Sequence, residues 1–434
     1  MNEKSTLFCG TPPFETVTDL YCITMLFLFP LFPGFSGYSN ITFSKFVFLL
    51  IATGIWLLAL AVCAFLRKEP LPRPGAAQWS ALIFLAVALC SACCSPFFPQ
   101  TLLGAGRYDG LLSIALYVLI FLGVSMFTRP KLIHFYAFAA AVTLCCIVAI
   151  LQLFGGNPLG LYPNALQWQD AGIRYSGAYL GTIGNTNLLD AVLCLALPLS
   201  SCAILRMRRW LFLIPLIVSA VIIAVAGGSG AVVALGAFCL AALCALPRQK
   251  KLLIFCLLLA AFLLLGVLAL LWFWPGTDGA AYEISQMIHG HFEDSYGSSR
   301  ILIWRGCLAL APERPLLGGG PGTLSMRLDI IFSRFVPETG TTLESYVDNA
   351  HNIYLGYLTN TGVLGLAAYL WLLLCCGLSA FSSNDLSRVC ALAVFCGAVH
   401  AFFGLGLCLT EPIFFVFLGF CASRIGKKTY QEAS

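Results

Sequence analysis

One histidine and several arginines of this chain stand where they could do chemistry. His351 and Asn352 lie in DNAHNIYLGYLTNTGVLGL, residues 348–366, where a polar segment gives way to a long apolar run. The run predicts a helix, and the positive end of its dipole disfavours an imidazolium and attracts anions. A neutral imidazole there can accept a proton, and nearby backbone N–H groups can hold a phosphate. The alternative, a structural polar residue, stays open.

Arg300 and Arg305 lie in SSRILIWRGCLALAPERP, residues 298–315, which predicts a short helix ended by prolines. Five residues along a helix place the two side chains about 140° apart, so both can hardly point into one pocket. We expect one to face a ligand and the other to pair with lipid phosphate or with a carboxylate such as Asp294. Trp304 shares a face with Arg300, which suits a sugar-phosphate site but equally suits anchoring at a membrane interface.

Two further arginines occupy shorter, glycine-rich loops. Arg107 belongs to GAGRYDG in the loop 95–110, and Arg174 belongs to DAGIRYSGAYLGTIGNTN in the loop 155–184. Asn185 or Asn187 at the end of that second loop can cap the helix that follows. Asp190 lies one turn inside this helix, where a carboxylate is costly without a partner, and Arg174 is the partner that the sequence suggests.

The elements that must position these residues are membrane helices. The 434-residue chain is 60% hydrophobic and only 10% charged, whereas soluble proteins carry about 25% charged residues. Its apolar runs are continuous, as in helices, and do not alternate as in a β-barrel. We predict an all-α integral membrane protein with about twelve spans, near 19–36, 44–66, 78–95, 111–127, 132–154, 185–205, 210–227, 229–246, 252–274, 352–377, 388–408 and 411–424.

The distribution of positive charge predicts the orientation. With the N-terminus in the cytoplasm, the inner segments hold 16 of the 24 Lys and Arg, mostly in short loops where the positive-inside rule has force. The first span is expected to stay, because no cleavable signal precedes it. The predicted location is therefore the plasma (inner) membrane, multi-pass, with the loops that carry the candidate residues on the extracytoplasmic face.

The predicted organisation is a membrane domain of spans 1–9 over residues 1–274, an extracytoplasmic loop over 275–350, and spans 10–12 over 351–434. In the loop, TLSMRLDIIFSRF is expected to form a second amphipathic helix after the one with Arg300, and LLGGGPGTL a plain turn.

Most of the 20 cysteines lie within spans and are interpreted as packing residues. His289 and His291 lack a spaced acidic ligand, so we predict no metal site. We also predict no cofactor and no nucleic-acid partner.

The stretch HNIYLGYLTNTGVLG resembles the signature of the O-antigen ligase and O-antigen polymerase superfamily. It fits H-N, nine residues, then G-x-x-G, with His351, Asn352, Gly362 and Gly365. The segments SSRILIWRGCLALAPERPLLGGGPGT and RYSGAYLGTIGNTN, and the long loop before the tenth span, extend the resemblance over nearly the whole chain. The chain departs from the pattern at 228–231, where it reads GSGA and relatives often carry SRGA, so a family-type arginine is missing.

The resemblance implies a GT-C-like membrane glycosyltransferase whose donor is a glycan on a polyprenyl diphosphate and whose acceptor is a glycan or glycolipid. His351 would assist the acceptor hydroxyl, while Arg174 and Arg300 would hold the diphosphate, which arginine forks suit without a metal. We add four candidate substrate-binding residues, which are Asn352, Arg107, Arg305 and Trp304.

Alternative functions stay open on the sequence. A polymerase of the same superfamily would use the same donor, as would a cell-wall polymerase of the shape, elongation and division type, although the His-Asn motif points away from the latter. A flippase for the lipid-linked glycan belongs to another class. It would be expected to show polar residues near the bilayer midplane and repeated halves, whereas here the polar residues collect at the outer rim.

Overall fold

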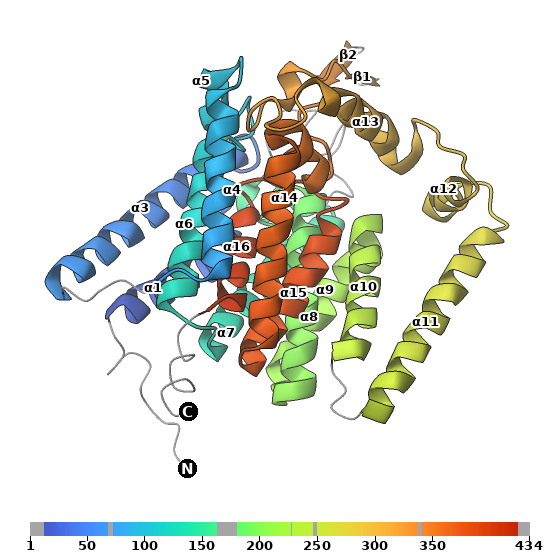
Figure 1. Cartoon of the computed structure of the whole chain (residues 1–434). Helices are drawn as coiled ribbons and strands as arrows, with labels where there is room; N and C mark the ends of the chain where they lie inside the picture. Colours follow the sequence, from blue (N-terminus) through green and yellow to red (C-terminus); the bar gives the residue numbers. More distant parts are fainter. Residues whose placement is uncertain are drawn as a thin grey trace.

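The computed structural model of this chain is a bundle of helices with a smaller layer, the 275–350 layer, over one end (Figure 1). The structure describes residues 13–67, 73–162, 180–226, 228–245, 250–336 and 341–423. In Figure 1 the 275–350 layer, with α13, β1 and β2, lies at the upper end of the bundle. The helices α8 and α14 run from this upper end to the lower end, where Met207 and Phe381 terminate them.

The helices of the bundle follow the apolar runs of the sequence. In chain order they are α1 Pro13–Ile23, α2 Phe29–Leu31, α3 Ile41–Arg67, α4 Ala76–Cys93, α5 Phe98–Leu103, α6 Leu111–Phe127, α7 Leu132–Leu153, α8 Thr186–Met207, α9 Leu213–Ala226, α10 Ser229–Ala245, α11 Lys250–Trp272, α14 Ile353–Phe381, α15 Asp385–His400 and α16 Glu411–Cys421. A π-helical turn, Thr24–Leu28, joins α1 to α2, and short 3-10 turns lie at Pro158–Gly160 and Trp210–Phe212.

Length and composition qualify six described helical segments as membrane spans, namely Pro13–Leu31, Gly37–Leu66, Ala76–Cys93, Leu132–Leu153, Thr186–Met207 and Ile353–Phe381. Shorter apolar helices occupy Leu111–Phe127, Trp210–Val225, Gly230–Leu243, Leu257–Trp272 and Glu411–Cys421. The chain is thus a multi-pass membrane protein built from helices, as predicted. Every predicted span overlaps a helix, but the count of twelve crossings stays a prediction.

The centre of the bundle is formed by α16 and α8. Every residue of α16 is buried, and α8 is buried over most of its length. In contrast, α11 stands apart from the bundle (Figure 1). Most of its described apolar side chains are exposed. Such a helix is stable only where its surroundings are apolar, as in lipid.

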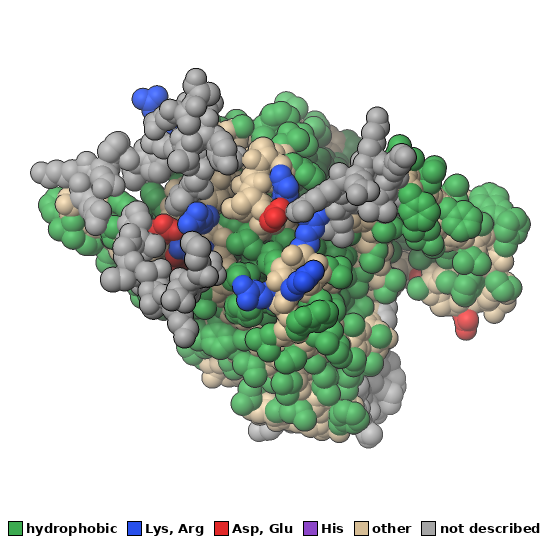
Figure 2. All heavy atoms as spheres, turned by 90° about the horizontal axis from the view of Figure 1, so that it is seen from below, with side chains coloured by type: hydrophobic (Ala, Val, Ile, Leu, Met, Phe, Trp, Pro, Cys, Tyr) green, Lys and Arg blue, Asp and Glu red, His purple; other side chains and the backbone are tan. Residues whose placement is uncertain are grey.

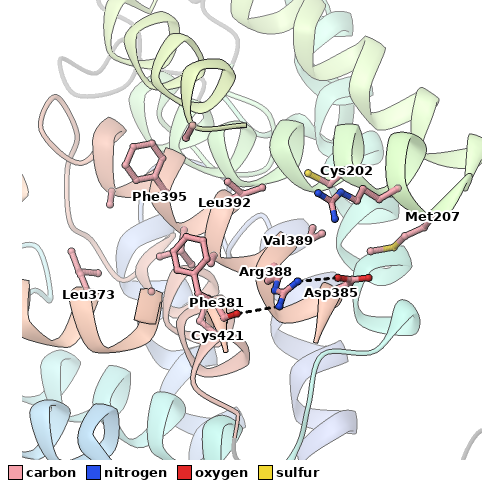
Figure 3. A pocket seen from close by; sticks show the side chains of 16 residues that line it. Cys202, Met207, Leu373, Phe381, Asp385, Arg388, Val389, Leu392, Phe395 and Cys421 are labelled. Atoms are coloured by element: carbon pink, nitrogen blue, oxygen red, sulfur yellow. Dashed lines mark hydrogen bonds and ion pairs between the residues drawn. The ribbon is translucent and has the colours of Figure 1, made fainter. Parts of the chain in front are cut away.

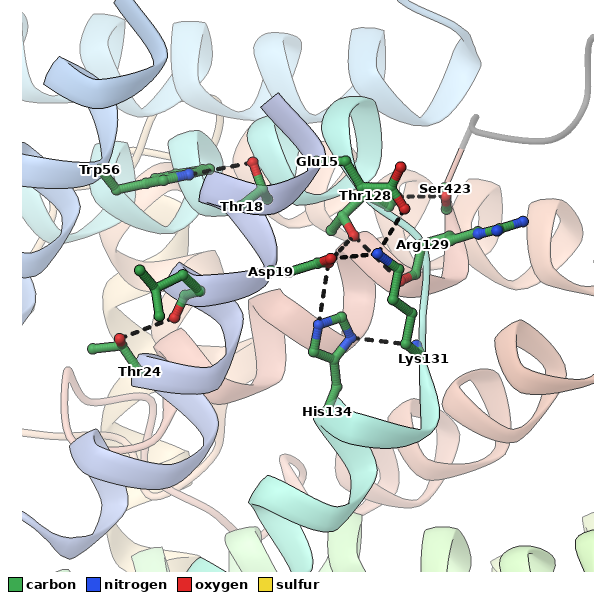
Figure 4. A network of polar contacts seen from close by, with 11 residues as sticks. Glu15, Thr18, Asp19, Thr24, Trp56, Thr128, Arg129, Lys131, His134 and Ser423 are labelled. Carbon is green, nitrogen blue, oxygen red and sulfur yellow. Dashed lines mark hydrogen bonds and ion pairs between the residues drawn. The ribbon is translucent and has the colours of Figure 1, made fainter. Parts of the chain in front are cut away.

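A polar network fixes the lower end of the bundle (Figure 4). Lys131, at the start of α7, forms ion pairs with Asp19 and, at 2.7 Å, with Glu15, both on α1. Thr128 donates its hydroxyl to Asp19 at 2.5 Å, and its own carbonyl accepts from Ser423, just after α16, at 2.7 Å. Buried carboxylates are tolerated in an apolar bundle only with such partners.

The described part of the 275–350 layer contains two α-helices and a hairpin. The helices are α12 Gly279–Ile288 and α13 Tyr296–Leu310, followed by a 3-10 turn at Ala311–Glu313. The predicted second amphipathic helix is wrong. Its residues form a 3-10 turn at Leu324–Met326 and then strand β1 Ile331–Val336, which pairs antiparallel with β2 Thr341–Tyr346. The β-branched and aromatic residues of both segments favour strands once each supplies the other's hydrogen bonds.

The glycine-rich stretch at 316–322 docks against a break in α14. At Gly362 the helix leaves helical geometry with φ +69°. The freed backbone groups of α14 pair with residues 315–320 instead. Val363 N donates to Pro315 O at 2.8 Å, and Gly320 N donates to Asn360 O at 2.8 Å. A Cβ at Gly362 would lie 2.2 Å from the carbonyl oxygen of Leu316. The stretch is a turn, as predicted, and it also completes the broken helix.

Candidate functional site

The candidate site is centred on His351, in the turn that leads into α14. Asn352 is the N-cap of that helix, and its side-chain oxygen accepts from Tyr354 N at 3.0 Å and Leu355 N at 3.1 Å. His351 has a left-handed backbone with φ +48°, and its N–H donates to the side-chain oxygen of Asn349 at 3.0 Å. Such a constrained conformation of a non-glycine residue persists only where its surroundings hold it.

Helix α13 lies against this turn. The indole N–H of Trp304 donates to the carbonyl of Ala350 at 3.1 Å. The indole ring packs against Phe402 and Phe403 in the turn after α15, at centroid distances of 5.5 and 6.3 Å. Ile353 N in turn donates to Ala401 O at 2.9 Å. Three segments that are far apart in sequence therefore meet around His351.

A side chain from α8 completes the frame. Asn187 donates to Phe403 O at 3.1 Å and accepts from Leu405 N at 3.2 Å. Its neighbour Asn185 caps α8 by accepting from Leu188 N at 3.1 Å, as predicted. The loop after α15 is thus tied on one side to α8 and on the other to α13 and the His351 turn.

Arg300 brings a positive charge to the site. Residues 297–299 have left-handed backbone conformations, so the regular part of α13 begins at Arg300. Its guanidinium is half-buried, and its Nε has no hydrogen-bond partner within the described part of the chain. Burial lowers the pKa of Arg300, which still stays protonated. A half-buried guanidinium with an unpaired Nε is a group that an anionic ligand would stabilise.

Arg107 reaches the same site from the loop between α5 and α6. Its Nε donates to Asp348 Oδ2 at 2.6 Å, and both side chains are about one-third exposed. This contact joins the 95–110 loop to the turn before α14, although 241 residues separate the two partners. A partly exposed pair of this kind contributes at most about 1 kcal/mol to stability.

The electrostatics keep His351 neutral. Burial, assisted by the positive charge of Arg300, lowers the pKa of His351 to about 4, while Asp348 acts in the opposite direction and Arg107 in the same direction as Arg300. The predicted neutral imidazole is therefore what the geometry supports. A neutral ring nitrogen can accept a proton from a hydroxyl group.

A small cavity of about 60 Å³, with several polar side chains in its lining, lies beside the helix start. Its lining includes Asp109, Asn349, Asn352, Tyr357 and Asn360. Burial raises the pKa of Asp109 to about 6. The sequence alone gives Asp109 and Asn349 no role, because their position at this cavity depends on how distant loops meet.

The remaining predicted site residues lie elsewhere. Arg305 points away and pairs with Asp294 at 2.6 Å, and both side chains are more than half exposed. This pairing confirms the carboxylate partner that the sequence suggested for one of the two arginines. Arg174 lies outside the described residues. Asp190 is buried and faces Gly228 in the turn before α10.

Within the described ranges, no group of three or more His, Cys, Asp or Glu side chains gathers as a metal site would require. The charges at the candidate site come instead from arginines and from Asp109 and Asp348. Any anionic ligand there would be held by guanidinium groups and backbone N–H groups.

The fold and the site define a multi-pass membrane protein with a neutral histidine and two arginines at one end of its helix bundle. Residues 214–370, from α9 into α14, match the family model described as O-antigen ligase. Over this range the chain resembles an O-antigen ligase domain, and the resemblance drawn from the His351 motif is confirmed. The matched range includes Arg300, Trp304, His351 and Asn352. No curated protein matches the chain.

Proposed function

We propose that this protein transfers a glycan from a polyprenyl-diphosphate donor to an acceptor hydroxyl on the extracytoplasmic face of the plasma membrane. The observation that carries the proposal is the neutral His351 in the electrostatic field of Arg300, at the start of a helix within the matched domain. A base and an anion-holding cation at one place are what glycosyl transfer from a diphosphate requires.

The reaction assigns a role to each group. The oxygen of the acceptor hydroxyl attacks the anomeric carbon, and its proton passes to a ring nitrogen of His351. The bond between the anomeric carbon and the diphosphate oxygen breaks, and the diphosphate leaves with the electron pair. Arg300 holds the leaving diphosphate, with Arg174 as its predicted second ligand. Displacement from the opposite side inverts the anomeric centre.

Donor binding would also prepare the base. In the free protein the charge of Arg300 lowers the pKa of His351, with burial as the larger cause. A bound diphosphate compensates that charge, so the pKa of His351 rises toward the range in which a base is effective. The donor thus activates the residue that deprotonates the acceptor.

The other residues hold this arrangement. Trp304 and Asn352 fix the turn that carries His351, through their hydrogen bonds to Ala350 O and to the first N–H groups of α14. Arg107, paired with Asp348, adds positive charge beside the turn that carries His351. Arg305 lies outside this group and at most touches the periphery of a large substrate.

A nucleotide-free assay tests the proposal. Purified protein receives a short polyprenyl-diphosphate glycan, without nucleotide, in the presence and in the absence of a second glycan or glycolipid acceptor. A ligase moves the glycan once onto the second acceptor, whereas a polymerase gives a ladder of longer lipid-linked products without it. The resemblance favours the ligase. His351→Ala should abolish either outcome while donor binding is retained.

A second measurement, of donor movement between leaflets, tests the transport alternative. In proteoliposomes, a flippase would move the labelled donor between leaflets without changing its glycan. If the wild-type protein gives that result and no transfer product, the enzyme hypothesis fails and a lipid-linked glycan transporter takes its place. His351→Ala then provides the control, because transport has no requirement for a base.

A further inference from the structure

A large groove opens at the lower end of the bundle, beside Phe381 and Arg388, and extends along α15 as far as Ala398. It has a volume of about 830 Å³ and lies between α8, α10, α14 and α15, with Cys421 of α16 also in its lining. This volume is within the roughly 300–1,000 Å³ range of small-molecule sites. The 29-residue helix α14 separates its mouth at Phe381 from the His351 turn.

The lining is apolar inside and basic at the rim. Inside, Leu373, Val389, Leu392 and Phe395 contribute aliphatic and aromatic surface, as Figure 3 shows. The rim carries Arg206 at the end of α8 and Arg388 in the first turn of α15. Figure 2, which views this end from below, shows Lys and Arg side chains gathered around the middle of the face.

Arg388 is held at the mouth. One guanidinium nitrogen donates to Phe381 O at 3.2 Å, and the other lies 3.6 Å from Asp385, as drawn in Figure 3. Both members of the ion pair are about half exposed, so Asp385 compensates the positive charge only weakly. Arg388 therefore still offers donors to an anion at the groove mouth.

The rim lies at the level expected for lipid headgroups. Just beyond Arg206, α8 ends at Met207, and Trp210 follows with 69% of its surface exposed. Exposed tryptophan is characteristic of the membrane–water interface. An apolar groove in the hydrocarbon region with arginines at the headgroup level matches the two parts of one lipid molecule. Basic pockets between membrane helices are known to recognise acidic lipid headgroups.

We propose that this groove binds one anionic glycerophospholipid from the leaflet at the lower end of the bundle. The phosphate lies between Arg206 and Arg388, and the acyl chains lie along Leu373, Leu392 and Phe395. The lipid fills a gap between α8, α14 and α15 and thereby stabilises the packing of three helices that also frame the upper site. This site is independent of the proposed glycan transfer.

A groove-filling variant and a matched control test whether the apolar part of the groove holds the acyl chains. Gly377 lines the groove on α14, and an added Cβ there would meet no atom within 4 Å, so Gly377→Leu places its side chain in the groove without a clash at Cβ. Gly236 on α10 is equally unobstructed and does not line the groove, so Gly236→Leu is its matched control. Both changes replace a helical glycine by a better helix former, so both variants should fold.

The rim is tested in the same way. Arg206→Gln and Arg388→Gln remove the proposed phosphate ligands, while Arg209→Gln removes an exposed arginine that follows α8 outside the lining. The full chain is purified in detergent and titrated with phosphatidylglycerol or phosphatidylcholine. Native mass spectrometry measures the occupancy of the first bound lipid, and thermal unfolding measures the gain in Tm.

The wild-type protein should retain one phosphatidylglycerol in preference to phosphatidylcholine and gain Tm with it. Each rim substitution should weaken the preference about fivefold, the scale of one basic residue at an anionic lipid surface. Gly377→Leu should abolish retention of the first lipid, and both controls should behave as wild type. Equal retention of the two lipids, or retention unchanged in Gly377→Leu, would overturn the proposal. A polyprenyl monophosphate that displaces phosphatidylglycerol outright would also overturn it.

Discussion

The indole N–H of Trp304 donates to the carbonyl of Ala350, one residue before His351. This bond joins α13 to the start of α14 across 46 residues of sequence. Because Arg300 stands one helical turn before Trp304, the same contact sets the position of the guanidinium relative to the imidazole. The separation of the proposed base from the proposed diphosphate ligand therefore depends on one hydrogen bond and the ring packing around it.

Trp304→Phe should separate the hydrogen bond from the packing. The phenyl ring retains much of the contact with Phe402 and Phe403, but the bond to Ala350 O is lost. We expect kcat for glycan transfer to fall about tenfold, because small displacements of reacting groups are costly, with KM for the donor changed little. Trp371→Phe, on the exposed side of α14, is the control and should leave kcat unchanged. A wild-type kcat in Trp304→Phe would remove the positioning role.

Arg300 and Arg305 should differ sharply in their effect on activity. Arg300→Ala removes the charge beside His351 and should lower the transfer rate on the order of 100-fold, the scale for losing a charge-stabilising donor. Arg300→Lys should restore little, because an ammonium lacks the bidentate fork. Arg305→Ala breaks only the exposed pair with Asp294 and should have a mild effect. Similar losses at both positions would show that Arg305 also contacts the substrate.

The helices and this division between the two arginines could be predicted because both depend on local sequence. Apolar runs mark the spans, and the five-residue spacing separates Arg300 from Arg305 on a helix. The hairpin could not be predicted from β1 alone. Its residues became a strand only because Thr341–Tyr346 supply the partner, and the amphipathic pattern of residues 323–335 fits a helix as well.

The cavity beside the His351 turn was missed for a related reason. Asp109 and Asn349 are ordinary loop residues in the sequence, and only the packing of the 95–110 loop on the start of α14 gives them their place. In the same way, the sequence does not indicate what the glycine-rich stretch at 316–322 packs against. Its role appears only where α14 breaks at Gly362. Contacts between distant segments, unlike helical periodicity, leave no local pattern.

The orientation of the bundle is open to a direct test. Topology reporters fused after Gly276 or Phe335 should report an extracytoplasmic location, and those fused after Arg209 or Lys251 a cytoplasmic one. The reason is the bias of Lys and Arg toward the segments that the sequence assigns to the cytoplasm. The opposite pattern would put the His351 site in the cytoplasm and would exclude a donor presented on the outer leaflet.

Gly362→Ala should destabilise the protein. The glycine has φ +69°, and an added Cβ would lie 2.2 Å from the carbonyl oxygen of Leu316, so both the backbone and the docked loop must shift. We expect a loss of roughly 2 kcal/mol or more in the free energy of unfolding, seen as a lower Tm. Gly356→Ala is the control on the same helix. No atom lies within 4 Å of its added Cβ, so it should be neutral or stabilising.

The pH dependence of transfer should reveal the coupling between Arg300 and His351. A base must be unprotonated, so activity is lost as pH falls through the pKa of His351. For kcat/KM of the donor, which reports on the free protein, the acid limb should lie near the pKa of about 4 that burial and Arg300 impose. For kcat, which reports on the complex, the acid limb should lie at higher pH, because the bound diphosphate compensates the charge of Arg300.

In Arg300→Gln the acid limb of the residual kcat/KM should also move to higher pH, since one cause of the lowered pKa of His351 is gone. Burial remains in this variant, so the limb should stay below the ordinary value of 6.5. A limb unmoved in Arg300→Gln would show that the guanidinium does not act on the base, and the proposed activation by donor binding would then fail.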